Sequence, residues 1–177
     1  NSVPEGEGGM VAVLGTNVEN IEKILIENEM NFKAEIANDN SDGQIVLSGK
    51  TKDIESLSEV LKEKKIKNIK LPVSAPFHSS LMNNATRIMK DELKNLNLEN
   101  SSNILISNVT ASEILKTEEI KDLLVKQIES RVRWRESVIN MINKGANHFI
   151  EIGPGKVLSG LVKRINKSVK VDSINSE

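Results

Sequence analysis

Residues 10–74 contain four strand patterns and two helix patterns, and their order limits the folds that this chain can adopt. Strands are predicted where apolar residues run together or alternate, at 10–14, 32–36, 44–47 and 69–73. Helices are predicted where apolar residues recur every three or four positions, from the capping box Thr16–Glu19 and from Thr51. The predicted order is therefore strand, helix, strand, strand, helix, strand.

This order is that of the split βαβ or ferredoxin-like pattern, in which two helices cover one face of a four-stranded sheet. We therefore predict a ferredoxin-like small subdomain at residues 10–74. In the rest of the chain, strands are predicted at 104–106, 149–152 and 169–174, and the strand at 149–152 is expected to be buried. Helices are predicted at 81–96, 118–129, 134–143 and 157–165. Because strands that alternate with helices favour a mostly parallel sheet, this half is predicted to be α/β and the whole chain α+β.

The amino-acid composition excludes several classes of protein. The chain has 177 residues and no cysteine, which excludes disulfides, thiolate metal sites and cysteine nucleophiles. Its 24 basic and 25 acidic side chains give a net charge of -1, so no overall field draws it to nucleic acid or to a membrane. No apolar run is long enough to cross a bilayer. The 2 histidines lie too far apart in sequence to suggest a compact metal site.

The two histidines are the first candidates for chemistry. His78 lies on a loop after Pro76, at the boundary between the two predicted units, where ligand crevices are common. Ser79, the next residue, can cap the helix that follows. His148 opens a predicted strand with no polar cluster near it in sequence, which favours a structural role. Position alone leaves a structural role open for His78 as well.

Two other features have plain interpretations. Gly153–Val157 superficially resembles a phosphate-binding loop, but it lacks the preceding glycine and the hydroxyl residue after the lysine, so we interpret it as a structural turn. Positive charge gathers in two clusters, at Lys62, Lys64, Lys65, Lys67 and Lys70 and at Arg131, Arg133 and Arg135. A solvated surface is the plainer interpretation of both clusters, and docking of an acidic partner is the alternative.

The segment Leu71–Ser79 reads Leu-Pro-Val-Ser-Ala-Pro-Phe-His-Ser and resembles the active-site histidine segment of the malonyl-CoA:acyl carrier protein transacylases. Further segments that resemble this family follow its order along the chain, at Pro4–Val13, Asn38–Gly49, Val132–Val138 and Glu151–Leu158. The resemblance therefore covers essentially the whole chain.

The resemblance implies a fold and a mechanism. The family inserts a ferredoxin-like subdomain into an α/β-hydrolase-like core, so residues 1–9 and 75–177 would form part of that core. His78 would take a proton from a serine that attacks the malonyl thioester, and the phosphopantetheine thiol of acyl carrier protein would then attack the acyl-serine. The main-chain carbonyl of Gln127 would orient the imidazole. The family uses no permanently bound cofactor; its substrates are malonyl-CoA and phosphopantetheinylated acyl carrier protein.

Further site residues follow from the same resemblance. Phe77 stands where a bulky ring accompanies malonyl instead of methylmalonyl substrates in related acyltransferases, although packing is the plainer explanation of this side chain. Ser74 and Asn38 would contact the substrate. Lys65 and Lys67 lie where contacts with the acyl carrier protein are expected.

The family's nucleophile lies in a Gly-His-Ser-x-Gly elbow, which no segment of the 177 residues matches. We therefore expect this chain alone to be inactive, with the N-terminal half of the same enzyme as a partner. Two alternatives stay open: the acyltransferase domain of a polyketide or multifunctional fatty acid synthase, and a noncatalytic ferredoxin-like interaction module. A free-standing transacylase would suit a bacterial cytoplasm or a plastid-like organelle.

Overall fold

The structure, a computed structural model, describes residues 3–4, 6–99 and 102–175. Its strands are β1 Gly8–Leu14, β2 Ala34–Ser41, β3 Gln44–Lys50, β4 Lys67–Lys70, β5 His148–Ile152 and β6 Lys170–Ile174. Its α-helices are α1 Val18–Glu27, α2 Thr51–Glu63, α3 Asn83–Glu92, α4 Thr117–Gln127, α5 Trp134–Asn143 and α6 Val157–Ile165. Two short 3-10 helices, η1 Ser80–Met82 and η2 Leu93–Asn95, flank α3.

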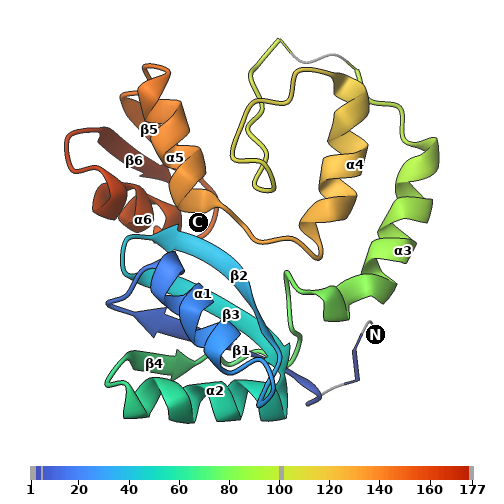
Figure 1. The fold of residues 1–177 in the computed structure, drawn as a ribbon. Helices are drawn as coiled ribbons and strands as arrows, with labels where there is room; N and C mark the ends of the chain where they lie inside the picture. The colour runs from blue at the N-terminus through green and yellow to red at the C-terminus, as the bar shows by residue number, and fades with distance from the viewer. Residues whose placement is uncertain (1–2, 5, 100–101, 176–177) are drawn as a thin grey trace.

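The predicted order of elements between residues 10 and 74 is confirmed (Figure 1). The predicted core segments 1–9 and 75–177 include some positions that lie outside the described residues, namely 1, 2, 5, 100, 101, 176 and 177. Within the described part, the chain is a mixture of helices and sheets, as predicted.

The first four strands form one antiparallel sheet in the order β2-β3-β1-β4. α1 and α2 pack on the same face of this sheet, because the apolar residues of both helices share one core with inward residues of β1 and β3. The fully buried members of that core are Val11, Val13, Ile21, Ile45, Leu47, Ile54, Leu57 and Leu61. Burial of side chains this large stabilises a fold by about 1.5–3 kcal/mol each, so this cluster is a main source of the sheet's stability.

The start of α1 differs from the prediction. Asn17 is the N-cap residue, and its side-chain oxygen accepts a hydrogen bond from the Asn20 amide at 2.9 Å. The prediction of a capping box that begins at Thr16 is therefore wrong. Asparagine is at least as good an N-cap as threonine, so adjacent candidates of this kind cannot be ranked from sequence alone.

The second half contains a single pair of parallel strands among the described residues, β5 and β6, which α6 connects. Val138 of α5 packs with Val162 of α6 and with Val169, just before β6, in a second core. The predicted mostly parallel sheet is therefore confirmed only for these two strands. None of the described helices is long and apolar enough to cross a membrane.

Two predictions for this half are wrong. The segment predicted as a strand at 104–106 is irregular, and only Ile106 forms an isolated bridge, with Glu113. β5 was expected to be buried, but Ile150 and Ile152 are 51% and 80% exposed. An apolar run shows that a segment favours burial, but it does not show that the same chain supplies the covering layer.

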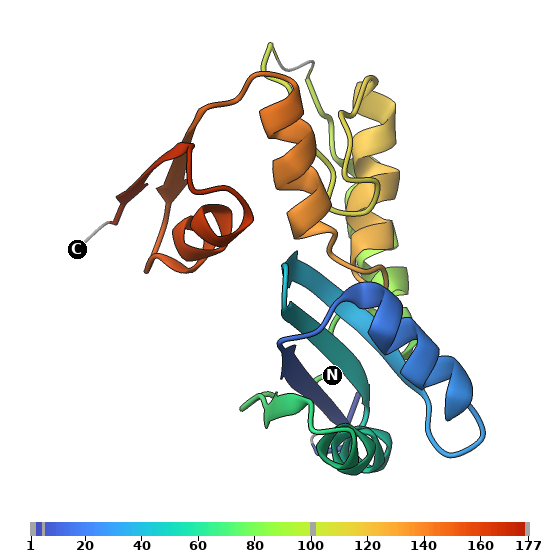
Figure 2. The same cartoon turned by 60° about the vertical axis from the view of Figure 1, so that its left-hand side comes forward.

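The two halves are joined along β2. The Asp39 amide donates to the Val132 carbonyl at 2.9 Å, and the Val132 amide donates to the Ala37 carbonyl at 2.8 Å. The link between α4 and α5 therefore runs beside β2 as a one-residue parallel bridge. Figure 2 shows this end of β2 close to the start of α5. The backbone pairing fixes where the C-terminal end of α4 lies relative to the small sheet.

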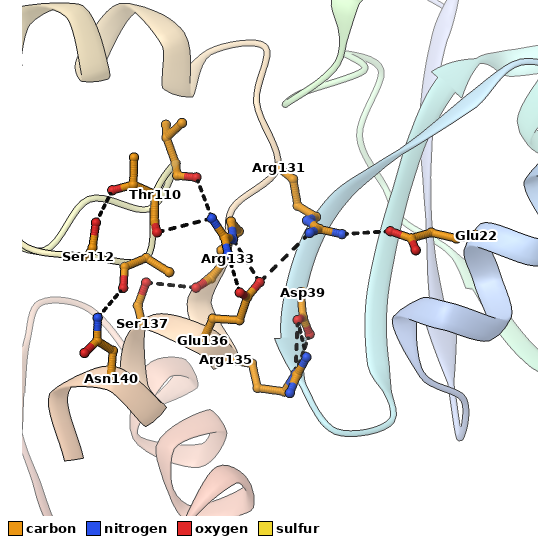
Figure 3. Close-up of polar contacts among 12 residues, drawn as sticks. Glu22, Asp39, Thr110, Ser112, Arg131, Arg133, Arg135, Glu136, Ser137 and Asn140 are labelled. Carbon is orange, nitrogen blue, oxygen red and sulfur yellow. Dashed lines mark hydrogen bonds and ion pairs between the residues drawn. The ribbon is translucent and has the colours of Figure 1, made fainter. Parts of the chain in front are cut away.

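The arginines that follow α4 are only partly exposed and form ion pairs within the chain, so their plain interpretation as a solvated surface is wrong, whereas docking of an acidic partner stays a prediction. Arg135 donates from Nε to both carboxylate oxygens of Asp39, at 3.0 and 3.1 Å, and its Nη2 lies 2.9 Å from Oδ2 (Figure 3). Arg133 pairs with Glu136, which holds the pKa of that carboxyl below its ordinary value. Of the two pairs, the one between Arg135 and Asp39 reinforces the backbone junction at β2.

Candidate active site

His78 lies on the loop that leaves the small sheet after β4 and leads into η1 and α3. Its side chain is partly buried. Its backbone is left-handed, with a φ of 56°, a conformation that residues other than glycine rarely adopt. Such strain persists only where surrounding contacts determine it, so the loop at His78 is held in a defined shape.

The imidazole of His78 is tied to the end of α4. Its Nδ1 lies 2.8 Å from the main-chain carbonyl oxygen of Gln127, the last residue of that helix. The final carbonyls of a helix lack partners within it, which leaves this oxygen free to accept a hydrogen bond. Because a carbonyl only accepts, Nδ1 carries a proton, and in the neutral ring the lone pair of Nε2 is then available. The arrangement prepares Nε2 to act as a base.

A groove of about 460 Å³ opens beside the ring, between α3 and the end of α4. These two helices lie side by side in both views (Figures 1 and 2). Besides His78 and Gln127, the groove is lined by Phe77, Met82, Ala85, Ile88, Met89, Glu92 and Ile128. No group of three or more histidine, aspartate or glutamate side chains in the described part of the chain is arranged to hold a metal ion. The groove therefore presents a mainly apolar wall next to one imidazole.

Short contacts within the loop fix its course. Ser79 donates from Oγ to the Pro76 carbonyl at 2.7 Å, so it closes the turn at His78. Ser79 is the N-cap residue of η1, as predicted, although its side chain makes no cap hydrogen bond. Gly8 approaches Pro76 so closely that an added Cβ would lie 2.2 Å from the proline Cδ. Only glycine fits at that position beside the loop.

Two residues that support the site were missed in the sequence. Asn108 donates from Nδ2 to the Gln127 side-chain oxygen at 3.0 Å, beside the carbonyl that receives His78. Ser48 is fully buried in β3 and donates from Oγ to the Phe77 carbonyl at 2.6 Å. A lone hydroxyl after an apolar run was a usable signal for Ser48, because a buried polar group needs a partner. Asn108 lies in an irregular segment and had no comparable signal.

The structure brings Phe77, His78 and Gln127 together around the groove. It does not place Ser74 or Asn38 among the groove's lining residues: Ser74 is exposed on the same loop, and Asn38 lies partly buried in β2. The two lysines predicted to contact a carrier protein, Lys65 and Lys67, are exposed, one just before β4 and the other its first residue.

Comparison with known proteins gives the family. Residues 2–176 match a family model described as "Acyl transferase domain". The chain belongs to the acyl transferase domain family. A relative of this acyl transferase domain, the malonyl CoA-acyl carrier protein transacylase of Bacillus subtilis, is 42% identical over 98% of this chain and 56% of its own length. The same-named protein of Staphylococcus aureus is 40% identical over 98% of this chain and 57% of its own length.

Solved structures of relatives share the fold of this acyl transferase domain. The malonyl CoA-acyl carrier protein transacylase of Clostridium perfringens is 42% identical, with a TM-score of 0.94 over 98% of this chain and 55% of that one. A malonyl-transacylase in complex with a type II PKS acyl-carrier protein is 31% identical, with a TM-score of 0.90 over 99% of this chain and 56% of that one. The chain therefore spans about half the length of the relatives it matches.

Proposed function

We propose that this acyl transferase domain serves an enzyme that transfers a malonyl group from coenzyme A to the phosphopantetheine thiol of acyl carrier protein. The observation that carries the proposal is the hydrogen bond between His78 Nδ1 and the Gln127 carbonyl, which leaves Nε2 free as a base. The named activity of the relatives and the carrier-protein complex of one of them support the choice of substrates. The route of the malonyl group follows from what such a base can do.

In the first half-reaction, His78 Nε2 takes the proton of a serine hydroxyl as its oxygen attacks the malonyl thioester carbon. The carbon-sulfur bond then breaks, and coenzyme A leaves as a thiol with the proton from the imidazolium. In the second half-reaction, His78 accepts the proton of the carrier thiol while its sulfur attacks the acyl-serine. The serine leaves with that proton, so the imidazole ends as it began.

Because the Gln127 carbonyl holds Nδ1–H, the ring keeps one tautomer and one orientation through both half-reactions. A main-chain oxygen does this work without depending on the identity of the side chain. The side chain of Gln127 instead bonds Asn108, which steadies the end of α4. We infer that this second bond helps to keep the carbonyl in place.

The serine in this scheme comes from outside the 177 residues, which contain no Gly-x-Ser-x-Gly segment. One described surface suits a covering layer from the rest of the enzyme: β5 and β6 expose Ile150, Ile152 and Ile174 on one face. Parallel sheets are almost always covered on both faces, so these exposed isoleucines favour a further packing partner. We infer that the N-terminal half of the enzyme is that partner and that this chain alone is inactive.

The remaining assignments belong to the same proposal. Phe77, which lines the groove, would crowd an α-methyl group and favour malonyl, an effect limited to about 1–3 kcal/mol. Ser74 and Asn38 would contact the substrate once the other half is in place. Lys65 and Lys67 are exposed and would attract the acidic surface of the carrier protein.

The same family likeness extends to architecture. We infer that the sheet β2-β3-β1-β4 with α1 and α2 is a ferredoxin-like subdomain at residues 10–74, inserted into an α/β-hydrolase-like core. Its antiparallel strand order and the position of both helices on one face support this inference. The flanking parts, 1–9 and 75–177, would then belong to the core.

The test joins this chain to the N-terminal portion of the Bacillus subtilis relative and incubates the purified protein with malonyl-CoA and phosphopantetheinylated acyl carrier protein. Intact-mass spectrometry should show one malonyl group on the joined protein and then on the carrier. The 177-residue chain alone, treated in the same way, should gain no acyl group. A joined protein that folds but never acquires or passes on a malonyl group would refute the proposed function.

A further inference from the structure

Two neighbouring side chains of the small sheet hold the His78 loop on both sides of the histidine. Ser48 of β3 and Glu35 of β2 are direct partners in the antiparallel register, which places their side chains on the same face of the sheet. Ser48 donates to the Phe77 carbonyl at 2.6 Å. Glu35 Oε1 accepts from the Ser80 amide at 3.0 Å and from the Ser80 hydroxyl at 2.5 Å.

The Ser48 bond holds the peptide group between Phe77 and His78. The Phe77 carbonyl and the His78 amide belong to one planar group, so fixing the oxygen also fixes the plane from which the histidine side chain departs. Ser48 is 0% exposed, so its hydroxyl has no contact with solvent that could replace this bond. The Ser48 bond therefore fixes the backbone amide of His78, whereas the Gln127 carbonyl fixes its ring.

The Glu35 bonds act after the histidine. They fix Ser80, the first residue of η1, and so determine where the loop ends. Between the two held points lies the left-handed backbone of His78, with its φ of 56°. A strained residue keeps such a conformation only while contacts on both sides hold it. Without them, the loop would relax and carry the imidazole away from the end of α4.

We propose that Ser48 and Glu35 are positioning residues. Together they form a clamp on the small sheet that determines where the His78 imidazole lies. The consequence for catalysis rests on the proposed function, whereas the effect on the ring itself does not. The clamp gives the small sheet a role in the reaction without any contact with substrate: it positions the base.

The direct readout is the tautomer of His78 in the 177-residue chain, observed by NMR of histidine side chains labelled with nitrogen-15 at about pH 8, above the ordinary histidine pKa. The native chain should give an Nδ1–H form for His78. His148 serves as an internal reference with the other tautomer, Nε2–H, because its Nε2 donates to the Asp172 carboxylate at 2.7 Å. Ser48→Ala should abolish the single Nδ1–H state of His78 and leave His148 unchanged.

The chain offers a matched control. Ser41 is a buried serine of β2 whose hydroxyl has no hydrogen-bond partner among the described residues. Ser41→Ala should therefore leave the His78 spectrum as it is. Ser48→Thr, which keeps the hydroxyl, should preserve the Nδ1–H state. If Ser48→Ala does not fold, Glu35→Ala tests the same clamp at an exposed position, and it too should release the ring.

In the chain joined to the N-terminal portion of the Bacillus subtilis relative, Ser48→Ala should lower kcat by up to about 10²-fold with little change in KM. A base displaced by about 1 Å loses that much activity. A folded Ser48→Ala or Glu35→Ala chain that keeps the native Nδ1–H signal would overturn the clamp. So would a native chain without that signal. A joined protein that shows no transfer in its native form bears only on the proposed function, since the ring readout requires no activity.

Discussion

Replacing Asp39 by alanine should weaken the junction between the small sheet and the start of α5, which the linker at Val132 connects to the end of α4. Asp39 is 1% exposed, and its carboxylate accepts two hydrogen bonds from Arg135 Nε, with the Nη2 atom 2.9 Å away. Asp39→Ala removes all of these contacts and leaves the Arg135 guanidinium without the carboxylate that neutralises its charge. A guanidinium stays protonated throughout the ordinary pH range, so Arg135 keeps its charge after Asp39 is removed.

The expected cost follows from the burial of the two partners. Removing one member of a fully buried ion pair costs about 3–5 kcal/mol, because the other charge stays buried without a partner. The Arg135 side chain keeps 24% exposure and has a second carboxylate, Asp42, 3.7 Å from Nε. Both features lower the penalty, so we expect a loss of about 2–3 kcal/mol in the free energy of unfolding.

Urea unfolding of the chain, followed by the fluorescence of Trp134, measures this loss. Trp134 is the only tryptophan and directly precedes Arg135 at the start of α5. A loss of this size lowers the urea midpoint by about 1 M for a chain with an ordinary denaturant slope. Asp42→Ala is the matched control: Asp42 is 81% exposed, and such surface pairs contribute about 0–1 kcal/mol. Equal midpoints for the two variants would refute the view that the buried pair holds the junction.

Two further changes test other parts of the structure. Because hydrogen bonds from Arg133 lower the pKa of Glu136 below its ordinary 4.5, this pair stabilises the fold fully above that value and loses the contribution as pH falls through the lower folded pKa. Thermal melts from about pH 6 to about pH 3 should therefore show a shallower acid loss for Glu136→Gln than for the native chain, and parallel curves would count against the pair. Gly8→Ala places a Cβ 2.2 Å from Pro76 and should destabilise the chain by about 1–3 kcal/mol in urea, whereas a native midpoint would show that the loop moves freely.

Local sequence patterns predicted the small sheet well. Its strands and helices alternate with clear periodicity, and residues such as Leu57 and Leu61 lie in the core where that periodicity puts them. The His78–Gln127 contact joins positions 49 residues apart. Only the family resemblance linked these two residues, because no local pattern carries information about a contact at that separation.

Two of the failed predictions share a physical cause, since both depended on what lies opposite a segment. Arg135 is basic like a surface residue, but Asp39, buried on another element, neutralises it. Ile152 belongs to an apolar run like a core strand, but no described layer covers it. Ser48 had a signal that could be used, whereas its acceptor, the Phe77 carbonyl, could be found only from the folded chain.

The rate of serine acylation tests the central claim most directly. The assay uses the chain joined to the N-terminal portion of the Bacillus subtilis relative and monitors a single turnover with malonyl-CoA by the appearance of the acyl-enzyme mass. His78→Ala should slow this step about 10²–10⁴-fold, the usual loss for a general base. His148→Ala, which removes the other histidine, should leave the rate close to native. A His78→Ala protein that acylates within about twofold of the native rate would contradict the assignment of His78 as the base.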